Sequence, residues 1–279
     1  MQLSNRALST SASTVSIQAI SPVRLNIAQT SRWRSRALCT ALLAGFSLPT
    51  LADALGVRAG AYRWNADYRG DVQAGGESID IHDDLGISDD DSNVFSIAFE
   101  HPIPFLPNVL LQRTELDTSA SETLSRSFEF DDEIYIASDT VNTDLDLSHT
   151  DATLYYEVLD NWVELDLGLT VRYFEEGVRL QAQTTGQRSE LDLNAVLPMV
   201  YAAARFNLPL SGFYVAVDGN GVGYSGSTLF DYRAMVGYES RIGLGAELGY
   251  RSFDLSYDDD DDEAEIKIDG VFAQVFYHF

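Results

Sequence analysis

In the stretch WVELDLGLTVRYF, residues 162–174, apolar side chains alternate with polar residues or glycine from Val163 to Tyr173. Successive residues of a β-strand point to opposite faces, so the stretch predicts a strand with one apolar and one polar face. The apolar face carries Val163, Leu165, Leu167, Leu169, Val171 and Tyr173. A single strand of this kind also fits a half-buried strand of a soluble sheet, so the fold depends on how often the pattern recurs and how long its segments are.

The same alternation recurs through the chain from residue 55 to residue 279. We predict ten strands, at 55–66, 93–101, 108–118, 147–159, 162–175, 195–207, 212–222, 228–239, 242–256 and 266–279. Most are longer than the five or six residues usual in soluble sheets, and they match the roughly 9–11 residues with which a tilted strand crosses a bilayer. The prediction is an all-β fold, a closed antiparallel up-and-down transmembrane β-barrel of about ten strands.

Two segments leave the strand count open. The alternation in 108–118 is ambiguous, and SFEFDDEIYIAS (127–138) fits either a hairpin inside a loop or additional strands. Barrels of eight or twelve strands are therefore the alternatives.

The connections between the predicted strands alternate in length. Short links at 101–107, 160–161, 208–212 and 239–240 separate longer ones at about 69–92, 119–146, 176–194 and 257–265. Short turns on the periplasmic side and longer loops outside are typical of outer-membrane barrels. Because unpaired backbone groups are untenable in lipid, the last strand is expected to pair with the first and close the barrel.

The N-terminal segment has the features of an export signal. Arg32, Arg34 and Arg36 precede the apolar run ALCTALLAGFSLP (37–49), which is followed by the small residues Ala52 and Ala54. We predict a signal peptide at 32–54, cleaved after Ala54 or, as the alternative, after Ala52, because the apolar run is too short to span a membrane as a helix. Residues 1–31 form an N-terminal extension, which is either a start codon assigned too far upstream or an extended signal.

Charge and cysteine content exclude several classes of protein. The formal net charge is −25, and residues 55–279 hold 13 Lys and Arg against 42 Asp and Glu, which excludes a nucleic-acid partner. Aromatic residues make up 11% of the chain, which argues against an acidic disordered protein. The one cysteine, Cys39, lies in the predicted signal peptide, so no disulfide framework is expected.

The chain ends with GVFAQVFYHF (270–279). This ending resembles that of Gram-negative outer-membrane barrels, which finish with a terminal Phe, an aromatic residue two positions earlier and alternating apolar residues upstream. The positions that match are Val271, Ala273, Val275, Tyr277 and Phe279. Residues 55–279 also resemble small outer-membrane barrels known by location alone. The resemblance implies an outer-membrane location, outer-membrane lipid and lipopolysaccharide as surroundings, and recognition of the last strand by the barrel-assembly machinery.

The polar faces of the predicted strands collect ionisable side chains. The inward set is Arg58, Glu100, Glu157, Glu164, Asp166, Arg172, Arg205, Asp231, Arg233, Glu247 and Arg251. One interpretation is a structural network of ion pairs that fills a narrow lumen, since buried charges need partners. The other is the selectivity lining of a small pore. Ten strands enclose little more space than side chains fill, and the bulky Tyr201, Met235, Phe272 and Phe276 also point inward, so we favour the filled lumen.

Two connections are strongly acidic, ESIDIHDDLGISDDDS (77–92) and YDDDDDEAE (257–265). The first interpretation is solvated charge that keeps the loops soluble; the second is low-affinity binding of Ca²⁺ or Mg²⁺. The candidate metal ligands are Asp89, Asp90, Asp91, Asp258, Asp259 and Asp260, although neither run matches the spacing of an EF-hand loop. No other cofactor is expected.

Histidines are the residues on which an enzymatic interpretation would depend. His82 stands beside acidic residues in a predicted outer loop, where ten-stranded omptin-like proteases use Asp/His pairs, but no second loop offers a matching D-x-H element. His149 follows Ser148, and adjacency in sequence does not make a triad. The sequence therefore favours a non-enzymatic outer-membrane barrel of structural or passive character with acidic external loops. A narrow channel or transporter is the first alternative, and a barrel hydrolase is the second.

Overall fold

The structure is a computed structural model that describes residues 55–279 except 75, 104, 132, 176, 193, 194, 260 and 261. The predicted extension 1–31 and signal peptide 32–54 lie outside the described residues. In the part of the chain that is described, no helix is long and apolar enough to cross a bilayer. The described residues form strands, turns and irregular connections.

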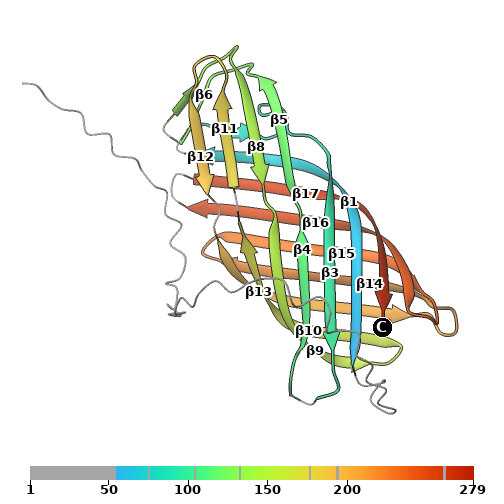
Figure 1. The fold of residues 1–279 in the computed structure, drawn as a ribbon. Coiled ribbons are helices and arrows are strands. Elements are labelled where there is room, and N and C mark those ends of the chain that lie inside the picture. The colour runs from blue at the N-terminus through green and yellow to red at the C-terminus, as the bar shows by residue number, and fades with distance from the viewer. Residues whose placement is uncertain are drawn as a thin grey trace, which may run out of the picture. The chain divides into compact units, whose positions relative to one another are not determined.

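A closed antiparallel barrel of ten strands organises the chain (Figure 1). Its strands are β1 (Gly56–Ala74), β3 (Asp90–Glu100), β4 (Asn108–Thr114), β9 (His149–Asp160), β10 (Val163–Phe174), β13 (Val196–Asn207), β14 (Phe213–Tyr224), β15 (Ser227–Glu239), β16 (Leu244–Asp259) and β17 (Asp262–His278). Each corresponds to one of the ten predicted segments, so the predicted fold and the strand count of ten are confirmed.

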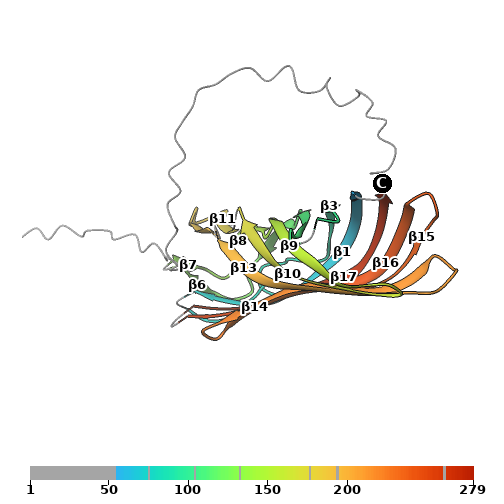
Figure 2. The ribbon, with the colours of Figure 1, turned by 90° about the horizontal axis from the view of Figure 1, so that it is seen from below.

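The barrel closes where β17 pairs with β1 (Figure 2). The pairing runs from Arg58 opposite His278 to Ala74 opposite Asp262, with one irregularity between Trp64 and Asp67. The backbone N–H of Phe279 donates to the carbonyl of Val57 at 2.9 Å, so the pairing includes the last residue of the chain.

Much of what the sequence predicts as long loops is strand, and here the prediction was wrong. A second sheet, in the order β12-β11-β8-β5, continues the barrel strands β13, β10, β9 and β4 beyond the barrel. Its members are β5 (Asp117–Thr123), β8 (Thr140–Asp146), β11 (Gly177–Ala182) and β12 (Arg188–Asp192). Buried and exposed residues do alternate in these segments, where Val141, Leu145, Leu180 and Ala182 are buried. The many acidic and polar residues between them make this alternation hard to recognise in the sequence. Residues 127–138 hold the short strands β6 (Phe128–Phe130) and β7 (Glu133–Tyr135), which form a hairpin inside a connection.

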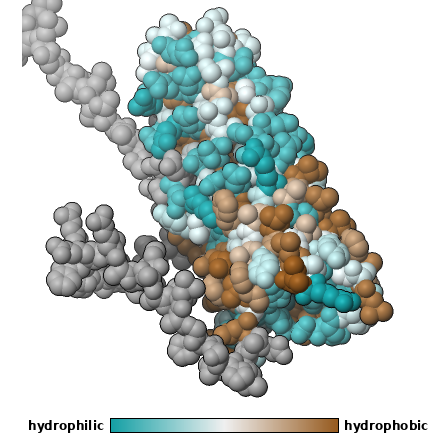
Figure 3. Space-filling model, turned by 45° about the vertical axis from the view of Figure 1, so that its right-hand side comes forward, coloured by the Kyte–Doolittle hydropathy of each residue, from teal (hydrophilic) through white to brown (hydrophobic). Residues whose placement is uncertain are grey.

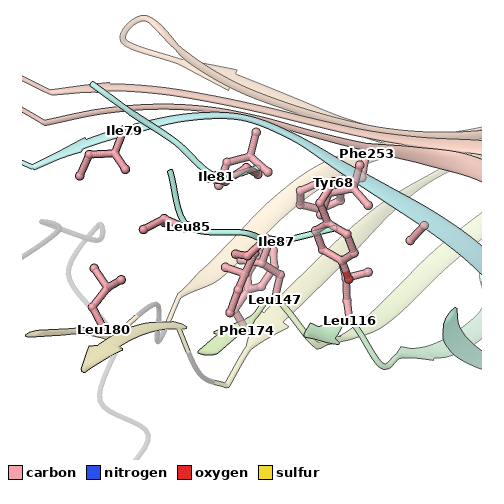
Figure 4. Close-up of a cluster of buried hydrophobic side chains, with 14 of the residues drawn as sticks. Tyr68, Ile79, Ile81, Leu85, Ile87, Leu116, Leu147, Phe174, Leu180 and Phe253 are labelled. Carbon is pink, nitrogen blue, oxygen red and sulfur yellow. The ribbon is translucent and has the colours of Figure 1, made fainter. Parts of the chain in front are cut away.

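We call the described residues within 67–89, 116–147, 177–192 and 254–268 the head. The head has its own apolar core, to which the short strand β2 (Ile79–Asp80) and the turn that follows contribute Ile79, Ile81, Leu85 and Ile87 (Figure 4). These side chains pack with Leu116, Leu147, Leu180 and Phe253 from the surrounding strands. The outer end of the barrel is therefore filled by packed side chains.

Outward-facing positions change character along a single strand. On β17 the outward residues Glu263, Glu265, Lys267 and Asp269 are followed by Val271, Ala273, Val275 and Tyr277. Val271 and Val275 are about three-fifths exposed, as expected for side chains that face lipid. The apolar residues gather at the lower part of the surface in Figure 3, whereas the head is hydrophilic. The apolar belt therefore lies at the end that carries the short turns and the C-terminus.

Candidate functional site: the charged lumen

The inward face of the barrel holds five of the 13 Lys and Arg found in residues 55–279. They are Arg58, Arg172, Arg205, Arg233 and Arg251, from β1, β10, β13, β15 and β16. The structure places all five inside the barrel, where each contacts at least one carboxylate. Their contacts form three levels from the head to the short turns.

The level nearest the head centres on Asp231, whose carboxylate binds two arginines. Arg172 Nη2 donates to it at 2.6 Å, and Arg251 donates through Nε at 2.8 Å and Nη2 at 2.7 Å. Arg172 also binds Asp151 with two hydrogen bonds, at 2.8 and 2.7 Å. All four residues are at most 4% exposed. Because β10 and β15 are not neighbours in the wall, the Arg172–Asp231 pair crosses the lumen.

Neutral groups complete this level. Arg251 Nη1 donates to the hydroxyl of Tyr62 at 2.8 Å, and the guanidinium lies 4.6 Å from the centre of the Trp64 ring. Thr114 Oγ1 accepts a longer bond from the same nitrogen, at 3.4 Å. Strands β1, β4, β9, β10, β15 and β16 are thus joined through one cluster. Desolvated charges of this kind persist because each has an opposite charge and hydrogen-bond partners.

The middle level is the pair of Arg233 and Asp218. Two bonds of 2.9 Å join the guanidinium to the carboxylate, in the bidentate geometry that makes arginine–carboxylate pairs specific. Next to it, Thr170 Oγ1 donates to Asn220 at 2.5 Å, and the hydroxyls of Thr153 and Thr170 are 2.7 Å apart. A cavity of about 20 Å³ lies between these groups and the upper level. This volume holds about one water molecule.

The level nearest the short turns combines two arginines with aromatic rings. Arg58 binds Glu247 at 2.6 Å and lies 3.9 Å from the centre of the Phe276 ring. Arg205 binds Glu239 at 3.1 Å and lies 3.6 Å from the centre of the Tyr214 ring. Guanidinium groups stacked on ring faces gain a cation–π attraction that is largest where water is excluded.

A glycine in β16 makes room for one of these rings. A Cβ at Gly245 would lie 2.1 Å from Cζ of Phe276, so the ring occupies the space that any side chain at this position would need. The sequence places glycines on the inward face of this strand, and the structure shows that aromatic rings from β17 fill the gap.

Four inward carboxylates lie at the turn end, and three of them accept hydrogen bonds from neutral groups. Tyr155 donates to Glu100 at 3.0 Å, and Asn108 donates to Glu157 at 2.8 Å. Asp166 Oδ1 is buried and has no hydrogen-bond partner among the described residues. Glu164 lies 3.7 Å from Arg205 and accepts a hydrogen bond from Asn207. The predicted inward set therefore divides into a paired network and an acidic group at the turn end.

The structure gives the candidate metal ligands other contacts. Asp91 pairs with Arg63 at 2.7 Å on the outer face, and Asp90 accepts a hydrogen bond from the backbone of Asp91. Asp89 and Asp258 are exposed, whereas Asp260 and the side chain of Asp259 lie outside the described part. Among the described residues, no three His, Cys, Asp or Glu side chains are arranged to hold a metal ion.

The histidines are tied into the local structure. His82 Nδ1 donates to the carbonyl of Ile87 at 2.8 Å, and His149 Nδ1 donates to that of Leu147 at 2.9 Å. Ser148 Oγ, next to His149 in sequence, accepts the backbone N–H of Leu116. His149 is fully buried, so its ring does not face an outer surface. These contacts use Nδ1 of both histidines and the hydroxyl of Ser148, whereas Nε2 of His149 is buried and has no hydrogen-bond partner among the described residues.

Several lumen residues were missed from the sequence. Asp151, Asp218 and Glu239 each pair with an arginine, and Tyr62 and Trp64 contact Arg251. A signal was present for four of them, because Asp151, Tyr62 and Trp64 share the inward side of their strands with predicted inward residues, and Asp218 faces Arg233 in the hairpin of β14 and β15. Glu239 lies at the end of its strand, where alternation is least informative.

Asp139 joins two connections of the head. Its carboxylate accepts the backbone N–H groups of Thr184 at 2.9 Å and Thr185 at 3.0 Å, and the Thr185 hydroxyl at 2.9 Å. Burial is the largest influence on the pKa of Asp139 and acts to raise it, but the hydrogen bonds from Thr185 and Thr184 together outweigh it and lower the pKa.

We expect Asp139→Asn to weaken the head at neutral pH. The folded state lowers this pKa, so the stability that the ionised carboxylate contributes is present above the ordinary aspartate pKa and is lost as the pH falls through the folded value. Amide hydrogen exchange of Thr184 and Thr185 is therefore expected to be faster in the variant at pH 7, and the difference is expected to shrink towards pH 2. Asp144→Asn, at an exposed position of β8, is the matched control. Equal protection in wild type and Asp139→Asn at pH 7 would contradict the role.

Comparisons with known proteins add similarity of fold and nothing more specific. No family model matches the chain, and no curated protein matches it. The outer-membrane protease OmpT of Escherichia coli aligns over 84% of this chain and 99% of its own, with 9% identity and a TM-score of 0.45. The Pseudomonas putida toluene transporter TodX aligns over 81% and 89%, with 12% identity and a TM-score of 0.33. The transport unit of the E. coli autotransporter AIDA-I aligns over 85% and 94%, with 9% identity and a TM-score of 0.35. Similarity at this level transfers no activity.

Proposed function

We propose that the protein is an integral outer-membrane barrel of passive, structural character that does not conduct solutes and holds a rigid acidic head outside the membrane. One observation carries the proposal. The lumen is crossed by the buried pair of Arg172 and Asp231, and the outer end above it is filled by the core of the head. A route for solute would have to break both.

The charge of the head supports a surface role. Residues 67–89, 116–147, 177–192 and 254–268 contain 26 Asp and Glu against five Lys and Arg. The four-stranded sheet of the head continues four strands of the barrel and carries six of these acidic residues, which are Asp117, Glu122, Asp144, Asp146, Glu190 and Asp192. Outward acidic charge keeps such a surface soluble and repels other acidic surfaces. We propose no catalytic step, because the described histidine contacts are structural.

Location and assembly belong to the same proposal. An apolar belt with Val271, Val275 and Tyr277 exposed suits outer-membrane lipid, and Phe279 directly follows the strand that closes the barrel and is hydrogen-bonded to Val57. We propose that the barrel-assembly machinery reads this strand and that lipopolysaccharide surrounds the outer half of the belt.

Planar-bilayer recording tests the closed lumen. The purified protein is expected to give no stable discrete openings, whereas a porin in the same membranes conducts. A variant with Asp218→Ser and Arg233→Ser removes the middle pair as a unit and enlarges the adjoining cavity, so no buried charge loses its partner. Discrete openings of the wild-type protein would overturn the proposal and favour the narrow channel. Openings confined to the variant would show that the side chains of the lumen close it.

A further inference from the structure

Two of the short turns share an unusual design. The four-residue turns are IPFL (103–106) and LPLS (208–211), each with proline at its second position. In each turn the backbone N–H of the fourth residue donates to the carbonyl of the first. These bonds are Leu106 to Ile103 at 3.4 Å and Ser211 to Leu208 at 3.3 Å. The third residues, Phe105 and Leu210, have φ angles of 68° and 65°. Turns with positive φ at the third position ordinarily place Gly or Asn there, because a bulky side chain is strained in this region.

The two residues with positive φ also have the most exposed apolar side chains of the turns. Phe105 is 95% exposed and Leu210 is fully exposed, and the neighbouring Ile103 and Leu106 are more than half exposed. Strain of this kind persists where the surroundings compensate for it. Water offers no compensation to a phenyl ring or an isobutyl group, so the two side chains require an apolar partner outside the chain.

The position of the turns identifies that partner. The hydroxyl of Tyr156, an outward residue of the apolar belt, donates to the carbonyl of Phe105 at 3.0 Å. The other turn is joined to the belt through the bond from Leu208 N to Phe213 O, and the Phe213 ring packs against Tyr238 at 4.9 Å. Both turns are therefore continuous with the lipid-facing surface at the lower end of the barrel (Figure 1).

The absence of charged residues from the two turns also indicates an apolar partner. Segments 101–107 and 208–212 contain no Asp, Glu, Lys or Arg, although residues 55–279 contain 42 acidic residues. A surface that faced water or an anionic partner would not need to exclude charge so completely. The boundary between phospholipid headgroups and acyl chains favours aromatic and aliphatic side chains without charge.

We propose that Phe105 and Leu210 are lipid anchors, which insert into the headgroup–acyl boundary of the phospholipid leaflet at the turn end of the barrel. The left-handed backbone directs each side chain away from its turn, and the surrounding lipid compensates for the strain. This inference rests on the transmembrane placement of the barrel and is independent of whether the lumen conducts.

Spin labels at the two tips test the proposal. Cys39→Ser removes the one cysteine of the chain, and Phe105→Cys or Leu210→Cys then carries the label, with the protein in phospholipid vesicles. Val275→Cys, in the apolar belt, is the lipid control, and Ser121→Cys, exposed on the head, is the water control. Labels at 105 and 210 are expected to collide more with oxygen than with a water-soluble nickel chelate, as the label at 275 does. If the labels at 105 and 210 were as accessible to the nickel chelate as the label at 121, while the label at 275 remained in lipid, the anchor proposal would be wrong. The transmembrane placement of the barrel would be unaffected.

Asparagine substitutions at the two positions provide a second test, in which the proposal predicts the direction of the change in stability. Asn tolerates positive φ, so Phe105→Asn and Leu210→Asn relieve backbone strain but remove the apolar side chain. The proposal predicts a lower urea midpoint in vesicles for each variant. An unchanged or higher midpoint would show that the tips are ordinary turns in water. Protection of the labels only after addition of periplasmic protein would assign the tips to a protein partner and overturn the lipid proposal.

Discussion

The Asp231→Asn variant is expected to lose about 3–5 kcal/mol of folding free energy, the range found when one member of a buried ion pair is removed. Asn keeps the size of the side chain but removes the charge, which leaves the buried guanidinium groups of Arg172 and Arg251 with only Asp151 as a charged partner in this level. Urea denaturation in lipid vesicles, followed by tryptophan fluorescence and by the gel shift of the folded barrel, measures the loss.

A second variant separates charge from packing. Replacing Asp151, Arg172, Asp231 and Arg251 together by Leu or Met removes the whole cluster and leaves no unpaired charge. Buried ionic clusters can often be exchanged for apolar side chains of similar volume with little loss of stability. The fourfold variant is therefore expected to be more stable than Asp231→Asn. If it is less stable, the cluster contributes mainly through its shape, and the account of an uncompensated charge is wrong.

The fold could be predicted from the sequence because bilayer and water impose opposite demands on alternate residues. In residues 163–173 the lipid-facing side chains are apolar and the inward residues are polar or glycine, so a period of two is visible without knowledge of any partner strand. The same contrast identifies inward arginines such as Arg172 and Arg251. In the head, both the outward residues and the connections are hydrophilic, so strands such as β8 and β11 read as acidic loops.

The pairing inside the lumen could not be predicted in this way. Alternation tells which side of the wall a residue faces, but a contact such as Arg172–Asp231 also depends on the tilt and stagger of strands that are not neighbours. Arg172 and Asp231 are 59 residues apart in sequence, and Arg251 and Tyr62 are 189 residues apart. The sequence therefore predicts the members of the network better than its connections.

Gly270 is a position where the closing seam leaves no room for a side chain. It lies on β17 opposite Arg251 of β16, next to the irregularity in the pairing of β17 with β1. A Cβ at this position would lie 1.9 Å from the carbonyl oxygen of Asn65, which belongs to the backbone of β1 and cannot turn away as a side chain would. The strands must separate locally before even alanine fits.

Gly270→Ala is therefore expected to weaken the seam that closes the barrel. Overpacking costs typically about 1–3 kcal/mol, and we expect the upper end of that range because the clash is with backbone. The reduced fraction of folded barrel after refolding into vesicles, read from the heat-dependent gel shift, measures the effect. Gly223→Ala is the matched control in another barrel strand, because the nearest atom to its Cβ is Thr228 Cγ2 at 3.5 Å, an ordinary contact. If the two variants gave the same folded fraction, the strands at the seam could separate enough to accommodate a methyl group. A defect confined to Gly270→Ala would show that closure of the barrel depends on the close approach of β1 and β17.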